Sequence, residues 1–142
     1  MKFIAVIFTL IMVGYTSVDL HKPEVILNRT ITVVVPNVTS NEGTVYYTLY
    51  DEDGFMLTPI QTQSSHVIDK KSKVIFRDVV PGEYAIVCYH DENGNETMDF
   101  QSNGMPLEDY GVSNNPAAYG WPNYNTSKFE VSQNNVTLEI KF

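Results

Sequence analysis

Alternation of apolar and polar residues along the chain predicts a series of short β-strands. The clearest case runs from Val136 to Phe142, where every second residue is apolar and the residues between them are polar. Because successive side chains of a strand point to opposite faces, such a segment presents one apolar face to a core. The same pattern, less regular, covers four further segments: 30–36, 44–50, 73–79 and 128–132.

The segment from Glu83 to His90 differs from these strands because both of its faces are apolar. Tyr84, Ile86 and Cys88 point one way, and the residues between them point the other way. A strand with two apolar faces is covered on both sides, so we expect it at the centre of a sheet.

Two stretches of the chain show little periodicity. Over 55–71 we expect an irregular connection with one short strand at 66–68. Residues 91–126 form a long loop, and loops of this length in a compact domain are typically functional or held by something bound. About seven short strands, with turns between them and no amphipathic helix, predict an all-β fold: a single antiparallel β-sandwich with one long loop.

The first 17 residues carry the pattern of an export signal. Lys2 is followed by an apolar run from Phe3 to Val13, and then by small and polar residues. That run is shorter than the ~20 residues that a membrane-spanning helix needs. We therefore expect a signal peptide over 1–17 and a mature domain over 18–142 that has no membrane span and is secreted or periplasmic. An uncleaved membrane anchor is the alternative.

Charge and composition narrow the class of function. The formal net charge of −8 argues against a nucleic-acid partner, which requires a basic surface. Cys88 is the only cysteine, and its place in the central strand indicates a buried, unreactive thiol. Ser113 lies in GVSNN, which lacks the second glycine of a nucleophile elbow. The sequence therefore contains no catalytic signature.

Polarity changes abruptly after the central strand. Oxygen-bearing side chains follow at offsets 1, 3, 5 and 9, with a backbone carbonyl at offset 7: Asp91, Asn93, Asn95, Asp99 and Thr97. Alternate side chains of a tightly curved loop converge on one point, as in calcium loops. If so, Asp91 is a ligand outside the core, and Asp91→Ala would leave the fold intact. A polar turn bonded to its own backbone is the alternative, and a transition-metal site at His90 is a third.

Two other groups are candidate parts of a site. Asp51, Glu52 and Asp53 close the strand at 44–50, and they either meet the 91–99 loop or form a solvated turn. Four aromatic residues in the long loop form either a ligand face suited to a sugar or a mini-core that holds the loop down. These residues are Tyr110, Tyr119, Trp121 and Tyr124.

Several of these motifs resemble an exported bacterial family, the domain of unknown function DUF2141. The matching segments are 43–51, Gly54-Phe55, VIFRDVVPGEYAIVCYHDENGN over 74–95, 104–106, YG-x-SNN over 110–115, and 128–129. Members commonly read HDENGNG, whereas this chain has Glu96 at the last position. The resemblance implies a secreted or periplasmic β-sandwich, transthyretin-like or Ig-like, with no established enzymatic activity.

These observations predict an exported, non-enzymatic module that binds a ligand or associates with the cell envelope. Its acidic loop would be ordered by Ca²⁺, and its partner would be a glycan or an envelope protein. The alternative is a carbohydrate-active hydrolase or lyase that uses Asp91, Asp99 or His90 as acid/base groups. The absence of a paired-carboxylate or triad signature favours the binding module.

Overall fold

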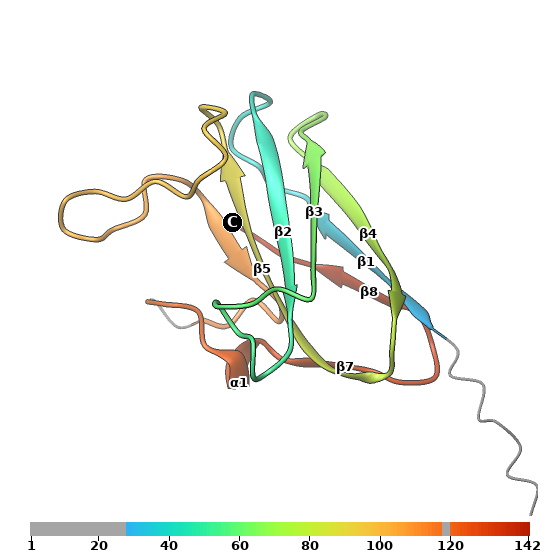
Figure 1. Ribbon diagram of the computed structural model, residues 1–142. Helices are drawn as coiled ribbons and strands as arrows, with labels where there is room; N and C mark the ends of the chain where they lie inside the picture. The colour runs from blue at the N-terminus through green and yellow to red at the C-terminus, as the bar shows by residue number, and fades with distance from the viewer. Residues whose placement is uncertain (1–27, 118–119) are drawn as a thin grey trace, which may run out of the picture.

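The computed structural model describes residues 28–117 and 120–142, and nearly all of their regular structure is β (Figure 1). The elements are β1 (Arg29–Val35), β2 (Thr44–Tyr50), β3 (Gln61–His66), β4 (Ser72–Val79), β5 (Gly82–Asp91), β6 (Tyr110–Val112), α1 (Tyr124–Ser127), β7 (Phe129–Val131) and β8 (Val136–Glu139). The predicted all-β class is confirmed. The expected signal peptide, 1–17, lies outside the described residues. Within the described part, no helix is long and apolar enough to span a membrane.

The strands form two sheets, which Figure 1 shows as separate layers. One sheet has the order β4-β1-β8, and the other has the order β3-β2-β5-β6 with β7 also paired to β5. Every pairing between these strands is antiparallel except that of β1 with β8, which is parallel. The prediction of a wholly antiparallel fold is therefore wrong at this pair. The reason is that the chain crosses from β7 in one sheet to β8 in the other and enters in the direction of β1.

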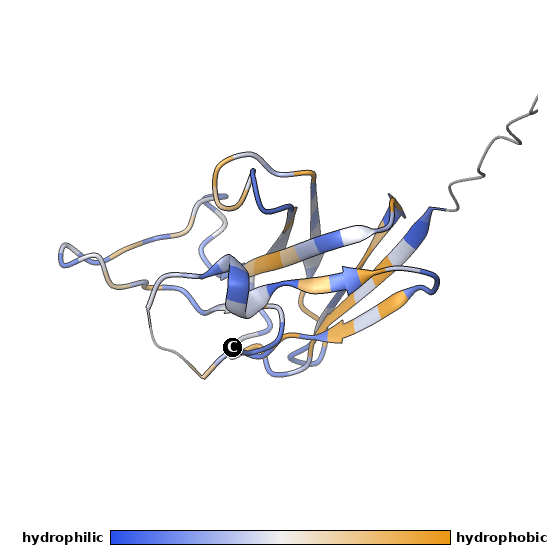
Figure 2. Ribbon diagram, turned by 90° about the horizontal axis from the view of Figure 1, so that it is seen from below, coloured by the Kyte–Doolittle hydropathy of each residue, from blue (hydrophilic) through white to orange (hydrophobic). Residues whose placement is uncertain are grey.

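Both sheets contribute their apolar faces to one core. In β1 from Ile31 on, and throughout β2, every second residue is buried, as the alternation predicted. Figure 2 shows that apolar and polar residues follow one another along several strands. β5 lies between β2 and β6, so its predicted central position is confirmed. The largest fully buried apolar side chains of these three strands are Ile31, Val33, Val35, Val45, Tyr47, Leu49 and Ile86.

Two segments differ from expectation. β3 covers Gln61–His66 rather than 66–68, and its sequence QTQSSH is polar and largely exposed because the strand lies at a sheet edge. An edge strand with little buried surface needs no apolar alternation, which is why the pattern missed it. The long loop contains β6 and the start of α1, of three and four residues. Elements this short show no measurable period.

The carboxylates at 51–53 do not meet the 91–99 loop. In the antiparallel pairing of β2 with β5, Thr44 lies opposite Asp91 and Tyr50 lies opposite Ala85. Asp51 therefore follows the end of β2 that is far from Asp91. Its Oδ1 instead accepts a hydrogen bond from the Gly54 backbone N at 2.8 Å, which closes a local turn.

The YG-x-SNN motif fastens the long loop to the core. A Cβ on Gly111 would lie 2.6 Å from Cγ2 of Ile140, so only glycine allows this close approach. Ser113 is fully buried, and its Oγ accepts a hydrogen bond from the Ile86 N at 3.0 Å and donates one to the Ser127 carbonyl. The Ser113 hydroxyl thus satisfies backbone groups of two elements, which is a structural role.

Two asparagine side chains hold the end of the chain. Nδ2 of Asn115 donates to the Glu139 carbonyl and its Oδ1 accepts from the Lys141 N, both at 2.8 Å. Asn37 makes the corresponding pair of bonds with the carbonyl and the N of Phe142, at 2.7 and 3.2 Å. These bonds continue the pairing of β8 beyond its last regular residue.

Candidate functional site

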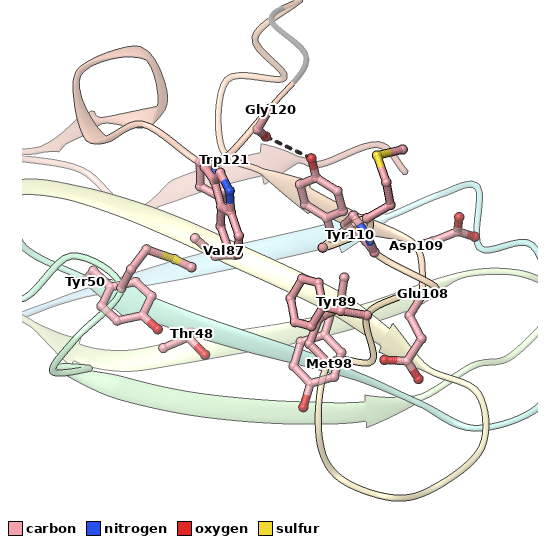
Figure 3. A pocket seen from close by; sticks show the side chains of 16 residues that line it. Thr48, Tyr50, Val87, Tyr89, Met98, Glu108, Asp109, Tyr110, Gly120 and Trp121 are labelled. Carbon is pink, nitrogen blue, oxygen red and sulfur yellow. Dashed lines mark hydrogen bonds between the residues drawn. The ribbon is translucent and has the colours of Figure 1, made fainter. Parts of the chain in front are cut away.

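A pocket of about 760 Å³ lies on the outer face of the β3-β2-β5-β6 sheet (Figure 3). Its floor consists of outward-pointing side chains of β2 and β5, namely Thr48, Tyr50, Val87 and Tyr89. Its walls come from segments that follow β5, together with Met56 from the connection between β2 and β3. The second apolar face of β5 is therefore only partly covered, and the partly exposed area is the floor of the pocket.

The walls of the pocket are aromatic and rich in sulfur. The rings of Phe100 and Trp121 stack at a centroid distance of 5.8 Å, which joins two parts of the long loop. The Tyr110 hydroxyl donates to the Gly120 carbonyl at 3.0 Å, a bond drawn in Figure 3. Three flexible thioether side chains, which adapt readily to apolar ligands, complete the lining: Met56, Met98 and Met105.

The structure brings two of the four predicted aromatic residues to this pocket, Tyr110 and Trp121. Trp121 is 74% exposed, so its ring is free to contact a ligand. Tyr124 is buried instead: its ring lies edge-on to Phe55 at 5.5 Å and its hydroxyl donates to the Glu83 carbonyl. It belongs to the mini-core under the loop. Tyr119, the fourth predicted residue, lies outside the described residues.

Carboxylates gather at the end of the pocket next to the 91–99 loop. Glu108 and Asp109 line the pocket, and Glu108 also borders a small hollow with Glu92 and Asp99. Oε2 of Glu108 accepts from the Asp99 N at 3.2 Å, while Oε1 is buried without a hydrogen-bond partner in the described part of the chain. Burial raises the pKa of Glu108, and the charges of Asp91 and Asp99 add to the rise.

Tyr89 connects the pocket floor with this acidic end. Its ring stacks on Tyr46 at 5.4 Å on the outer face of the sheet. Burial raises the pKa of Tyr89 to about 12, with the charge of Asp91 as the next cause. The phenol therefore keeps its proton at neutral pH and is available as a hydrogen-bond donor.

Asp91, the first predicted calcium ligand, is the last residue of β5 and is buried. Its carboxylate accepts hydrogen bonds from the backbone N of Gly94, Asn95 and Glu96, at 2.7, 3.2 and 2.8 Å. A carboxylate that satisfies three N–H groups cannot be removed without a loss of stability. The reason for expecting Asp91→Ala to leave the fold intact, a ligand outside the core, is therefore wrong, and we expect this variant to be less stable.

The other predicted ligands converge on Asp99. Nδ2 of Asn93 and Nδ2 of Asn95 both donate to Oδ2 of Asp99, at 2.7 and 2.9 Å. Oδ1 of Asn95 accepts from the N and Oγ1 of Thr97. The structure thus brings together the five residues that the spacing singled out and bonds them to one another and to the backbone. Calcium binding at this point requires both carboxamides to turn their oxygens toward Asp99, because Ca²⁺ takes oxygen ligands.

His90 and Cys88 are structural residues. His90 is buried, and its Nε2 lies 2.7 Å from the Glu42 carbonyl, which can only accept, so Nε2 carries the proton. Cys88 is buried as predicted, and burial raises the pKa of its thiol. Within 28–117 and 120–142, no group of three or more His, Cys, Asp or Glu side chains is placed to hold a metal ion.

The fold and the pocket define an all-β protein of two sheets with an aromatic pocket on the outer face of one sheet. A family model described as "Uncharacterized protein conserved in bacteria (DUF2141)" matches residues 33–139. The chain belongs to this family, as its motifs predicted. No curated protein and no solved structure matches the chain.

Glu96 lies where the HDENGNG pattern has its last glycine, and its backbone φ is 63°. In this left-handed region a side chain clashes with the backbone, and glycine avoids the clash. The glycine common at this position in the HDENGNG pattern thus has a conformational explanation. In this chain, the bond from the Glu96 N to Asp91 holds the same turn.

Proposed function

We propose that the protein is an exported, non-enzymatic binding module that holds a small organic ligand in the aromatic pocket. In this proposal the two sheets form a β-sandwich of the transthyretin-like or Ig-like kind. The observation that carries the proposal is the pocket itself. Its volume of about 760 Å³ lies within the range of ~300–1,000 Å³ typical of ligand sites, which are mostly apolar with a few polar groups.

The state of the acid/base candidates supports binding rather than hydrolysis. His90 and Asp91 are buried and bonded to the backbone, and Asp99 accepts two amide hydrogen bonds. General acid/base catalysis needs a group within hydrogen-bond reach of a substrate. The apolar run from Phe3 to Val13 supports export.

Trp121 provides a direct test because it is the only tryptophan of the chain and lines the pocket. We expect members of a library of small apolar and aromatic compounds to change its fluorescence and to compete with one another. Phe100→Ala removes the ring stacked on Trp121 and should weaken binding about tenfold, which corresponds to ~1.4 kcal/mol.

The matched control is Leu57→Ala, because Leu57 is 84% exposed and does not line the pocket. This variant should bind as the unmodified protein does. Saturation-transfer NMR on each variant gives a second measure of binding that does not depend on the tryptophan. Equal binding by the Phe100 and Leu57 variants, or no binding at millimolar concentrations, would refute the pocket as the site.

A second part of the proposal is that Ca²⁺ binds the loop through Asp91, Asn93, Asn95, Thr97 and Asp99. The convergence of both carboxamides on Asp99 supports it. Turning the carboxamides would place neutral and charged oxygens around one point, which is the ligand set that Ca²⁺ prefers. An ion there would order the loop that forms one wall of the pocket.

Calcium should therefore raise the melting temperature, and a chelator should lower it again. Binding to the folded state alone stabilises by about 2.7 kcal/mol at a hundredfold excess over Kd. Magnesium should do less, because it demands a tight octahedron and retains its waters. Differential scanning calorimetry measures the effect.

Asp99→Asn should remove the calcium response, whereas Asp53→Asn, an exposed residue beyond the far end of β2, should keep it. A melting temperature that is insensitive to calcium in the unmodified protein would identify the loop as a self-bonded polar turn.

A further inference from the structure

We infer that the ligand of the pocket is a small organic ammonium ion, with its positive charge at the acidic end and its apolar substituents against the aromatic and methionine walls. This inference rests on the proposed binding function and specifies the class of ligand. It is carried by three features of the pocket: acidic groups without a cationic partner, a buried carboxylate oxygen and aromatic faces. Of the acidic groups, Asp109 accepts a hydrogen bond from the neutral Thr39 hydroxyl at 2.6 Å and keeps its charge uncompensated.

The acidic groups of the pocket are not neutralised by cations of the chain. Glu108 and Asp109 line the pocket, and no Lys, Arg or His is among the described residues that line it. The ion pairs found in the described residues involve no pocket residue: Glu83–Lys128 and Glu139–Lys141. Carboxylates beside low-dielectric walls create a local negative potential, which raises the local concentration of cations.

Glu108 contributes a carboxylate whose hydrogen bonding is incomplete. The backbone N–H groups of Asp99 and Glu92 face it and lower its pKa, against the larger effect of burial, but its buried Oε1 makes no hydrogen bond of regular geometry with the described residues. A buried polar atom without a partner costs about 1–3 kcal/mol, and more if it is charged. Figure 3 shows Glu108 on the same side of the pocket as Tyr89 and Tyr110. A cation bound at this end would compensate the charge that the fold leaves unpaired.

The aromatic rings favour an organic cation over other ligands. The faces of Trp and Tyr attract cations within about 6 Å, and quaternary ammonium groups are typically bound in this way. Tyr89, Tyr110 and Trp121 supply such rings. A metal ion would gain nothing from the apolar walls, and a neutral sugar would need more hydrogen-bonding groups than they offer.

Three soluble benzyl compounds of similar shape test the inference: benzyltrimethylammonium, the uncharged benzyldimethylamine N-oxide and phenylmethanesulfonate. Each is titrated into the purified protein with a chelator present, so that no divalent ion occupies the carboxylates. Trp121 fluorescence and saturation-transfer NMR report binding. We expect the cation to bind at least about tenfold more tightly than the N-oxide, a difference of ~1.4 kcal/mol, and the sulfonate not to bind.

Glu108→Gln should reduce the ratio of the two affinities about tenfold, as should Asp109→Asn if the first variant folds poorly. Glu130→Gln, an exposed residue of β7 outside the pocket, should leave the ratio unchanged. Equal affinities for cation and N-oxide, or equal ratios in all variants, would overturn the inference but not the binding function. If neither these compounds nor the library bind, the proposed function itself fails.

Discussion

Ile86→Ala is expected to lower the free energy of unfolding by about 2–5 kcal/mol, the usual cost of a large-to-small change in a core. Ile86 is fully buried in the central strand β5, within the cluster to which both sheets contribute. Ile86 lies opposite Leu49 of β2, and the next residue of β5, Val87, lies opposite Val112 of β6. Because strand pairing holds the surrounding backbone on both sides, the neighbouring residues can move little to fill the cavity. Urea denaturation measures the loss of stability.

Thr137→Ala is the matched control for this prediction. Thr137 belongs to β8 and points to solvent, so its truncation should cost well under ~1 kcal/mol. Similar losses for the two variants would mean that the faces of these strands are assigned wrongly.

Ser113→Ala is expected to cost about 2–4 kcal/mol, although it removes a single oxygen atom. The Ser113 hydroxyl bonds the Ile86 N and the Ser127 carbonyl, and a buried group left without its partner costs ~1–3 kcal/mol. Alanine would leave both groups unsatisfied, because the site is fully buried and excludes water.

Ser132→Ala, at an exposed position between β7 and β8, should change stability by less than ~0.5 kcal/mol. Thermal and urea denaturation of both variants measure the difference. A Ser113 variant as stable as the Ser132 variant would contradict the structural role of the motif.

Strands with one buried face could be predicted from the sequence because burial imposes alternation. β2 follows the rule throughout, and β1 follows it from Ile31 to Val35. β3 lies at an edge and is mostly exposed, so nothing in its polar sequence marks it. The parallel pairing of β8 with β1 depends on how the chain crosses between sheets, and local patterns do not record that.

The acidic loop could be found from spacing, but the direction of its bonds could not. Alternate Asp and Asn residues indicated that their side chains converge, and Asp99 does receive Asn93 and Asn95. The same residue types also bond to the backbone, as Asp91 does, and the sequence does not distinguish the two arrangements.

The second apolar face of β5 was a signal for the pocket in the sequence. It was interpreted only as a sign that the strand is covered on both sides. Tyr50 and Tyr89 share the outer face of the sheet through the pairing of β2 with β5, but Phe100 joins them only where the long loop folds over that face.

Asn115 also affects how the molecule behaves at high concentration. An open strand edge presents unpaired N–H and C=O groups to other molecules and promotes edge-to-edge aggregation. The Asn115 carboxamide bonds the Glu139 carbonyl and the Lys141 N, on the side of the segment opposite to the Ile140 N, which pairs with Val34 of β1. A second copy would need those two groups to add a strand. A single side chain thus blocks strand addition at this end of the edge, where the described part of the sheet has no further strand.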